Sequence, residues 1–215
     1  MHFAAIRVGQ TVWDAAGRID PLSGMELTAS GLAETESQIT VADETSLTVI
    51  LVGSGQAEQQ AAAVAAKQIG IKRKTDARLG GLDYGLWQGL TIDEVRHRQP
   101  SLWKQWLESP LSVRPPGGET IDEIQQRLAE LLAEMPKRYR KHAPLLVLKP
   151  IPFAVLECML TGEGLERIWE KIRADARVLH ARYAEETAEW LVTAFEPHGE
   201  NEEEPVDAVE EVEEK

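Results

Sequence analysis

Three short apolar runs predict the buried strands of this chain. They cover residues 3–6, 46–54 and 143–150, and the second is rich in β-branched side chains. A continuous apolar run of this length favours a strand that is covered on both faces. Near the end, the stretch "RVLHARYAEETAEWLVTAFE" predicts two further strands around "EETAE", with a helix as the alternative.

Helical patterns separate these runs. The alanine-rich segment after the second strand contains no proline and ends at Gly70, a residue suited to a helix C-cap. Thr120 and Glu123 form the pattern of a capping box. In the helix that follows, apolar residues recur at helical spacing: Ile121, Ile124, Leu128, Leu131, Leu132 and Met135. After the third strand, a further helix is predicted to end at Gly162.

The alternation of strands and helices predicts the fold class. Such an order is typical of an α/β protein in which helices cover both faces of a mostly parallel sheet. We therefore expect a three-layer α/β/α sandwich, formed by one domain over residues 1–197.

Charge is concentrated at one end of the chain. The net charge of the 215 residues is −13, and residues 200–215 hold nine acidic side chains and one lysine, which is −8 and leaves −5 for the remainder. A segment so charged and without aromatic residues cannot form a core, so residues 198–215 are predicted to be a disordered acidic tail. The negative charge also argues against nucleic acid and membrane surfaces as partners.

Cysteine content and hydropathy bear on the compartment. Cys158 is the only cysteine, which excludes an internal disulfide, and we expect it to pack in the core. The sequence has no apolar run near the roughly 18 residues that span a bilayer, and its N-terminus lacks the pattern of a signal peptide. A cytoplasmic location is therefore the expectation.

Five loops or turns between the predicted elements, which we call corners, are candidates for a functional site. In α/β sheets, ligands bind where strands end and helices begin. Three corners of that kind are residues 7–11, 53–58 and 149–152, and two more are the loop "RLGGLDYGLWQGLT" and the turn "RPPGGET". Trp103 and Trp106, three residues apart, could line the mouth of a pocket, although core packing is the commoner role of tryptophan.

Taken in order, these corners resemble the motifs of the histidine phosphatase superfamily, the phosphoglycerate mutase-like proteins. The first, "RVGQTVWDAAGR", resembles the family's Arg-His-Gly-Glu/Gln-Thr with its following tryptophan and Gly-Arg. The stretch "ELTASG" resembles its Leu-Thr-x-x-Gly, and "RLGGLDYGLWQGLT" its Leu-x-Glu-x-Asp-Phe/Tyr-Gly-x-Trp-Glu-Gly. "PPGGET" with Arg127, and "LLVLKPIPFAVLECMLTG", resemble two later motifs. The resemblance covers residues 3–173 and implies a phosphoglycerate mutase-like fold.

The resemblance also implies that the catalytic positions have changed. Family members phosphorylate the histidine between the first arginine and glycine, where Val8 stands here. Glu58 replaces an arginine that clamps the phosphate, and Gly81 replaces the glutamate that is the general acid. Pro150 replaces a second histidine, which stabilises the transferring phosphoryl group. These four are vestigial catalytic positions, and of the central set only Arg7 is retained.

The substitutions predict a protein that is not an enzyme. Valine offers no lone pair to a phosphoryl group, Glu58 would repel one, and glycine carries no proton. The expectation is a catalytically inactive pseudoenzyme, without cofactor, that binds a protein partner or an acidic small molecule. Arg7, Arg18 and Lys149 are the candidates to hold an anion, with an ion pair to Glu58 as an equal alternative for Arg7.

Two other interpretations stay open. One is an active phosphatase or phosphoglycerate mutase-type phosphoryl-transfer enzyme with relocated catalytic residues, and the other is a scaffold without a ligand. The carboxylates near the expected pocket lack any spacing typical of a metal site, so no metal is expected; they are Asp14, Glu58, Asp83 and Glu119. The sequence does not name the partner or the ligand, and it leaves a homo-oligomer open.

Overall fold

A computed structural model describes residues 1–43, 46–174 and 177–197 of the chain. Six strands of this part form one sheet in the order β3-β2-β4-β1-β5-β6. They are β1 (His2–Arg7), β2 (Val49–Val52), β3 (Lys72–Thr75), β4 (Pro144–Leu148), β5 (Arg177–Ala184) and β6 (Glu189–Pro197). The predicted acidic tail, residues 198–215, lies outside the described residues.

The pairing of the strands confirms the predicted sheet. The three apolar runs form β1, β2 and β4, and the pairs β3–β2, β2–β4 and β4–β1 are parallel. At one edge, β5 pairs antiparallel with β1 and with β6. The two strands expected around "EETAE" are therefore confirmed as the hairpin of β5 and β6, and the sheet is mostly parallel.

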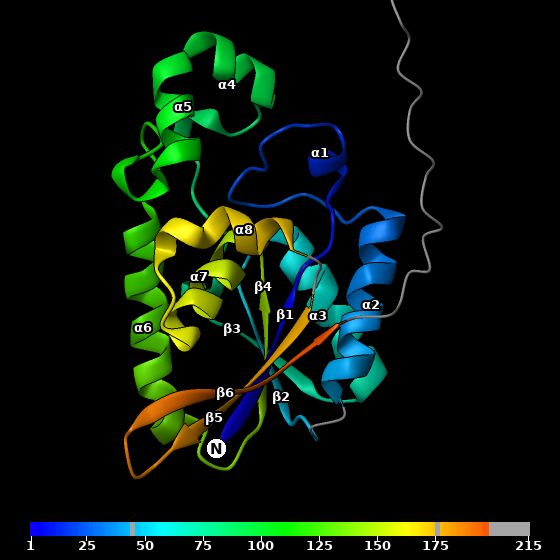
Figure 1. Ribbon diagram of the computed structural model, residues 1–215. Coiled ribbons are helices and arrows are strands. Elements are labelled where there is room, and N and C mark those ends of the chain that lie inside the picture. The colour runs from blue at the N-terminus through cyan, green and yellow to red at the C-terminus, as the bar shows by residue number, and fades with distance from the viewer. Residues whose placement is uncertain (44–45, 175–176, 198–215) are drawn as a thin grey trace, which may run out of the picture.

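Helices cover both faces of the sheet, which completes the predicted α/β sandwich (Figure 1). On one face lie α2 (Ala29–Asp43) and α3 (Gln56–Ile69), and on the other α6 (Ile121–Arg138), α7 (Pro150–Thr161) and α8 (Ile168–Arg173). Beyond the carboxyl ends of the parallel strands lie α1 (Val12–Ala15), α4 (Ile92–Arg98) and α5 (Pro100–Glu108). None of the helices in the described ranges is long and apolar enough to cross a membrane.

The alternation of side chains along β1 divides the core in two. Phe3 and Ala5 pack in a cluster with apolar residues of α6 and α7. Ala4 and Ile6 point the other way and pack with α2 and α3. Because successive strand residues face opposite sides of a sheet, a continuous apolar run is what a doubly covered strand requires.

The predicted helix ends are confirmed. Thr120 accepts a hydrogen bond from the Glu123 N–H, and the Glu123 carboxylate accepts one from the Thr120 N–H at 2.8 Å. Gly70 and Gly162 are C-caps with φ of 79° and 72°, a left-handed conformation that glycine adopts without steric cost. Cys158 is buried in the core, as expected.

One strand escaped prediction. Every residue of β3 is exposed, and its sequence "KRKT" carries no apolar signal. The strand lies at the edge of the sheet and pairs only with β2 among the described strands. Charged side chains are common on such edges because they oppose pairing with another chain, so hydrophobic pattern could not have revealed it.

A close backbone contact fixes the loop after β1 against α2. A Cβ added to Gly31 would lie 2.2 Å from the carbonyl oxygen of Gln10. We therefore expect Gly31→Ala to lower the free energy of unfolding by about 1–3 kcal/mol, the usual cost of overpacking. Denaturant unfolding would measure this, with Glu36→Ala on the exposed side of α2 as a control expected to change little. Equal unfolding midpoints for Gly31→Ala and wild type would contradict the contact.

Candidate functional site

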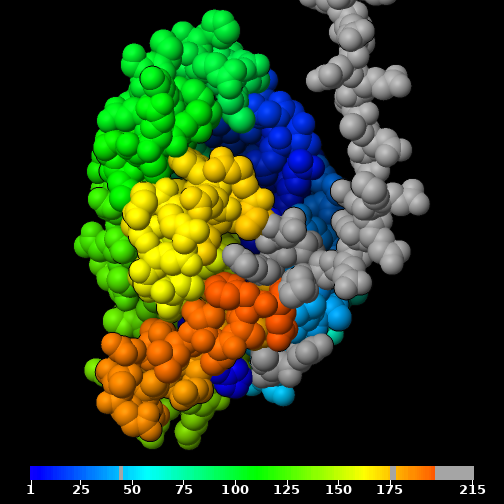
Figure 2. Space-filling view, viewed as in Figure 1, coloured from blue at the N-terminus to red at the C-terminus, as the bar shows by residue number. Residues whose placement is uncertain are grey.

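A cavity of about 400 Å³ lies at the carboxyl ends of β1 and β4. Its walls come from the segment after α1, the start of α3, the glycine-rich loop, α4, α5, the start of α7, and α8. In Figure 2, the yellow segment with α7 and α8 lies between the green helices and the dark blue N-terminal segment, the elements that enclose this cavity. Three of the predicted corners contribute: residues 53–58, residues 149–152 and the glycine-rich loop.

Val8 and Pro150 stand at the ends of neighbouring strands. Val8 is 2% exposed, packs among apolar side chains, and donates its N–H to the carbonyl of Leu148 at 2.8 Å. Pro150 lines the cavity as the first residue of α7, a position where a helix does not need the missing N–H. Val8 itself is not among the described residues that line the cavity.

Glu58 is a buried carboxyl group at the N-terminus of α3. It is 1% exposed. Its side chain folds back over the preceding turn, so that a Cβ on Gly55 would lie 2.4 Å from Glu58 Oε2. Within the described residues, Oε2 has no hydrogen-bond partner. Burial raises the pKa of Glu58, whereas Lys149 and the backbone N–H groups of Glu58 and Gly81 oppose that shift. The carboxyl group therefore holds its proton to a higher pH than an exposed glutamate.

Gly81 lies beside that carboxyl group. A Cβ at Gly81 would lie 3.5 Å from Cδ of Lys149 and 3.7 Å from Oε1 of Glu58. The space beside Gly81 is therefore bordered by an acid and an ammonium side chain from other elements. The loop is held in place by Arg127, which donates to the Gly81 carbonyl at 3.2 Å and pairs with Glu119 at 2.8 Å.

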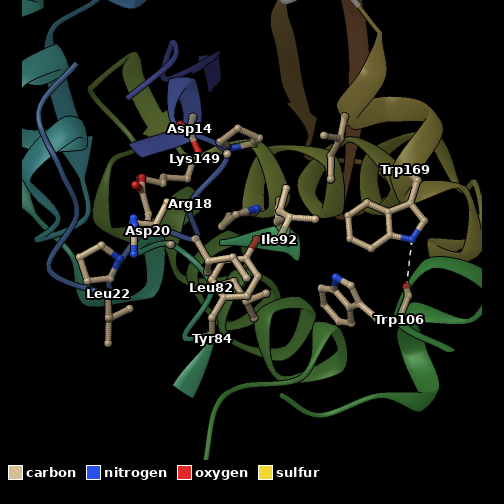
Figure 3. A pocket seen from close by; sticks show the side chains of 18 of the residues that line it. Asp14, Arg18, Asp20, Leu22, Leu82, Tyr84, Ile92, Trp106, Lys149 and Trp169 are labelled. Carbon is tan, nitrogen blue, oxygen red and sulfur yellow. Dashed lines mark hydrogen bonds and ion pairs between the residues drawn. The ribbon is translucent and has the colours of Figure 1, made fainter. Parts of the chain in front are cut away.

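Lys149 is the cation at the centre of the charged end. Its Nζ pairs with Asp20, and the two side chains are 15% and 9% exposed. Thr11 links Asp20 to a second carboxylate, since its Oγ1 lies 3.0 Å from Asp20 Oδ1 and 2.8 Å from Asp14 Oδ2. Figure 3 shows Asp14, Asp20 and Lys149 gathered at one end of the cavity.

Arg18 lies at the same end, but Arg7 does not. Arg18 lines the cavity, donates to the carbonyl of Gly89, and lies 5.6 Å from the centroid of the Trp13 ring. Arg7 donates to the carbonyls of Ile172 and Ala174 at 3.0 and 3.1 Å and lies 3.7 Å from Glu34. The structure thus pairs Arg7 with Glu34, not with Glu58, and brings Arg18 and Lys149 to the cavity.

The opposite end of the cavity is aromatic. Trp106 and Trp169 lie there (Figure 3), and Trp103 and Tyr84 also line the cavity, which confirms that the pair on α5 reaches the pocket. Trp169 donates its Nε1–H to the carbonyl of Trp106 at 3.2 Å, and their ring centroids are 5.2 Å apart. Burial, and then Asp14 and Asp20, raise the pKa of Tyr84, so its hydroxyl stays protonated.

Sequence reasoning missed Asp20 and Tyr84 as members of this site. Asp20 meets Lys149 across 129 positions of sequence, and no local pattern signals such a pair. Tyr84 belongs to the glycine-rich loop that was a candidate, so its motif was the available signal. None of the histidines in the described part lines the cavity, and no group of three or more potential metal ligands occurs there.

Glu58 couples folding stability to pH with a definite sign. Its pKa in the folded chain is raised above 4.5, so the folded state binds more protons than the unfolded state between those two pKa values. Its contribution is fully present below the unfolded pKa and is lost as pH rises through the folded pKa.

We therefore expect Glu58→Gln to gain stability relative to wild type between about pH 4.5 and about pH 8. Urea unfolding of both chains at the two pH values measures the difference, with Glu130→Gln on the exposed face of α6 as control. A difference that stays constant with pH, or changes in the opposite direction, would show that the pKa of Glu58 is not raised in the folded chain.

Comparison with known proteins gives one consistent family. A sequence profile of the histidine phosphatase superfamily (branch 1) matches residues 3–196. Phosphoserine phosphatase 1 of Hydrogenobacter thermophilus is 24% identical over 164 residues, covering 76% of this chain and 78% of the relative. A probable phosphoglycerate mutase of Salmonella choleraesuis is 28% identical over 157 residues, covering 73% of each protein.

Solved structures agree with the fold. Bacillus stearothermophilus YhfR superposes with a TM-score of 0.79 at 20% identity, covering 89% of this chain and 94% of its own. The α-ribazole phosphatase of Shigella flexneri superposes with a TM-score of 0.77 at 16% identity, covering 92% and 97%. The phosphoglycerate mutase-like fold implied by the motifs is therefore confirmed.

The prediction that the chain is not an enzyme is contradicted by these comparisons. The relatives it matches include a phosphoserine phosphatase and a probable phosphoglycerate mutase. The prediction rested on four replaced side chains. The sequence does not show that Glu58, Lys149, Arg18 and Asp20 line one cavity. With the motifs, the fold and a profile match over residues 3–196 in agreement, the chain belongs to the histidine phosphatase superfamily, branch 1.

Proposed function

We propose that this chain is a phosphoryl-transfer enzyme that hydrolyses phosphate monoesters in the cavity, with its catalytic groups relocated within the family's fold. The observation that carries the proposal is the position of Glu58. Its buried carboxyl group borders the space beside Gly81, with Oε1 3.7 Å from where a Cβ at that residue would lie. By the motif resemblance, residue 81 is where family members carry their acid.

Glu58 has the properties of a general acid. Its pKa is raised by burial, and Oε2 has no hydrogen-bond partner in the described part of the chain. A carboxylic acid can protonate a leaving alkoxide when its pKa lies near the working pH, and burial is the usual means of raising it. In this proposal, the glutamate that appears as a repulsive charge in the sequence acts as a proton donor.

Lys149 and Arg18 supply the positive charge. Both line the cavity, and Lys149 is held by Asp20 while its stem passes beside Gly81. Fixed cations in a partly buried site stabilise the charge that develops on phosphoryl oxygens. Lys149 therefore takes over the role of the arginine that the resemblance places at residue 58.

The proposed step transfers the phosphoryl group directly to water. The water oxygen forms a bond to phosphorus while the bond from phosphorus to the ester oxygen breaks. The leaving oxygen takes the proton of Glu58, and the Asp14 carboxylate at the cavity takes the proton that the water loses. A later exchange with solvent returns both carboxyl groups to their starting states, so no phosphohistidine is formed.

Phosphate release from phenyl phosphate tests the proposal. We expect turnover by the wild-type chain within the range of about 1–10³ s⁻¹ that is common among enzymes. Acid and alkaline quenching during turnover should trap no phosphorylated protein. A trapped phosphohistidine would assign the chemistry to a histidine, and absence of turnover above the buffer rate would reject the proposal.

A further inference from the structure

The two ends of the cavity differ in chemistry. Asp14, Asp20 and Lys149 lie at one end, and Trp106 and Trp169 at the other (Figure 3). A phosphate monoester has the same division, with a dianionic group joined to a leaving group of different character. If the phosphoryl group lies among the charged side chains, the leaving group extends toward the tryptophans.

The aromatic end is preformed. Trp106 is 2% exposed and meets the rings of Tyr84, Trp87 and Trp169 edge to face, with centroids 6.5, 6.0 and 5.2 Å apart. The hydrogen bond from Trp169 to the Trp106 carbonyl fixes that pair further. Because these side chains are already ordered, a ligand ring would bind there at little cost in conformational entropy.

Three large apolar side chains line the cavity and remain exposed. Leu22, Ile92 and Leu107 are 47%, 40% and 49% exposed, and they come from the segment after α1, from α4 and from α5. Apolar side chains that gather around a cavity, instead of scattering over a surface, mark a site for an apolar ligand. A hydroxyl- or carboxylate-rich leaving group would lose hydration against these side chains without gaining hydrogen bonds.

The cavity wall also holds an unsatisfied donor. Trp103 lines the cavity, and within the described residues its buried Nε1–H has no hydrogen-bond partner. A buried donor without an acceptor is unfavourable.

On the basis of the proposed function, we infer that the leaving group of the substrate is an uncharged, ring-bearing apolar alcohol or phenol. Small anionic phosphoesters, such as phosphoserine and 3-phosphoglycerate, are then poor substrates. Their carboxylates would lie against Trp106 and Trp169, at the end of the cavity away from Lys149 and Arg18 (Figure 3).

Binding and turnover test this inference separately. Binding of 1-naphthylmethylphosphonate, which lacks the scissile ester bond, is followed by tryptophan fluorescence and calorimetry. Turnover compares kcat/KM for 1-naphthyl phosphate with that for phosphoserine and 3-phosphoglycerate. We expect the phosphonate to bind, and 1-naphthyl phosphate to be preferred by at least about 100-fold, since about four or more buried ring carbons distinguish it from the anionic compounds.

Variants locate the binding. Leu107→Gln, next to Trp106 on α5, should weaken phosphonate binding by about threefold or more, whereas Leu86→Gln should leave it unchanged. Leu86 is the matched control, because it is 74% exposed and lies outside the cavity lining. Equal effects of Leu107→Gln and Leu86→Gln would overturn the placement of the leaving group.

The outcomes separate this inference from the proposed function. Phosphonate binding without hydrolysis of any ester would support the apolar site and reject the enzymatic proposal. Hydrolysis with phosphoserine or 3-phosphoglycerate preferred would reject the apolar leaving group and support the enzyme. Neither binding nor hydrolysis would overturn both.

Discussion

Glu58→Gln is expected to lower kcat for phenyl phosphate by about 10²–10⁴-fold, the range that general acid catalysis contributes. The amide has nearly the same size as the acid but cannot donate an acidic proton to the leaving oxygen. Because Glu58 is 1% exposed and folds back over Gly55, the amide should occupy the same place. Steady-state phosphate release measures the change, with Glu130→Gln expected to match wild type.

A substrate with a better leaving group tests whether the loss of activity in Glu58→Gln reflects lost proton donation. The anion of 4-nitrophenol leaves without protonation far more readily than that of phenol. We therefore expect Glu58→Gln to lose much less activity on 4-nitrophenyl phosphate than on phenyl phosphate. An equal loss on both substrates would indicate a structural effect of the substitution and would remove Glu58 from the role of acid.

The pH dependence follows from the same group. Since the protonated form of Glu58 is the active one, kcat should fall as pH rises through its pKa. That pKa is raised from 4.5 by burial, so the fall should occur at a higher pH than for an exposed glutamate. Glu58→Gln should lack this limb of the profile.

Lys149→Gln is the second substitution with a large expected effect. It removes a cation from the charged end, and loss of one such electrostatic contact lowers kcat by about 10²–10³-fold. It also leaves Asp20 without its ion-pair partner. Lys149→Arg keeps the charge and should retain part of the activity. As a control, Lys104→Gln should resemble wild type, because the Lys104 side chain on α5 is exposed.

Lys149→Arg and Lys149→Gln should also differ in pH profile. Lys149 lowers the pKa of Glu58, although burial outweighs it. Removing the charge should therefore move the alkaline limb of kcat to higher pH, while Lys149→Arg should leave it close to wild type. A limb that does not move in Lys149→Gln would show that these two groups are not coupled.

Local patterns were sufficient for most of the framework. The apolar runs of β1, β2 and β4 carry the signal of doubly covered strands, and Thr120, Gly70 and Gly162 mark helix ends by their own chemistry. These features depend on neighbours in sequence. The exposed strand β3 has no such signal, because its extended conformation depends on pairing with β2, a contact that no local pattern shows.

The site could be predicted only in part, because its contacts join distant residues. Lys149 was a candidate from its corner, but its partner Asp20 and its approach to Gly81 arise from folding. Glu58 was taken as a charge facing phosphate, since a sequence does not show burial or a raised pKa. Arg7 matched its motif, yet its guanidinium contacts the carbonyls of Ile172 and Ala174.

The central claim is that Glu58 and Lys149 perform phosphoryl transfer in this cavity. The most direct test is phosphate release from phenyl phosphate by wild type, Glu58→Gln, Lys149→Gln and the double variant, under single-turnover conditions with all four shown to be folded. The account predicts turnover by wild type and a double variant little worse than the poorer single variant, because groups that act as a unit are not additive. Wild-type release at the rate of buffer, or a double variant as active as wild type, would contradict it.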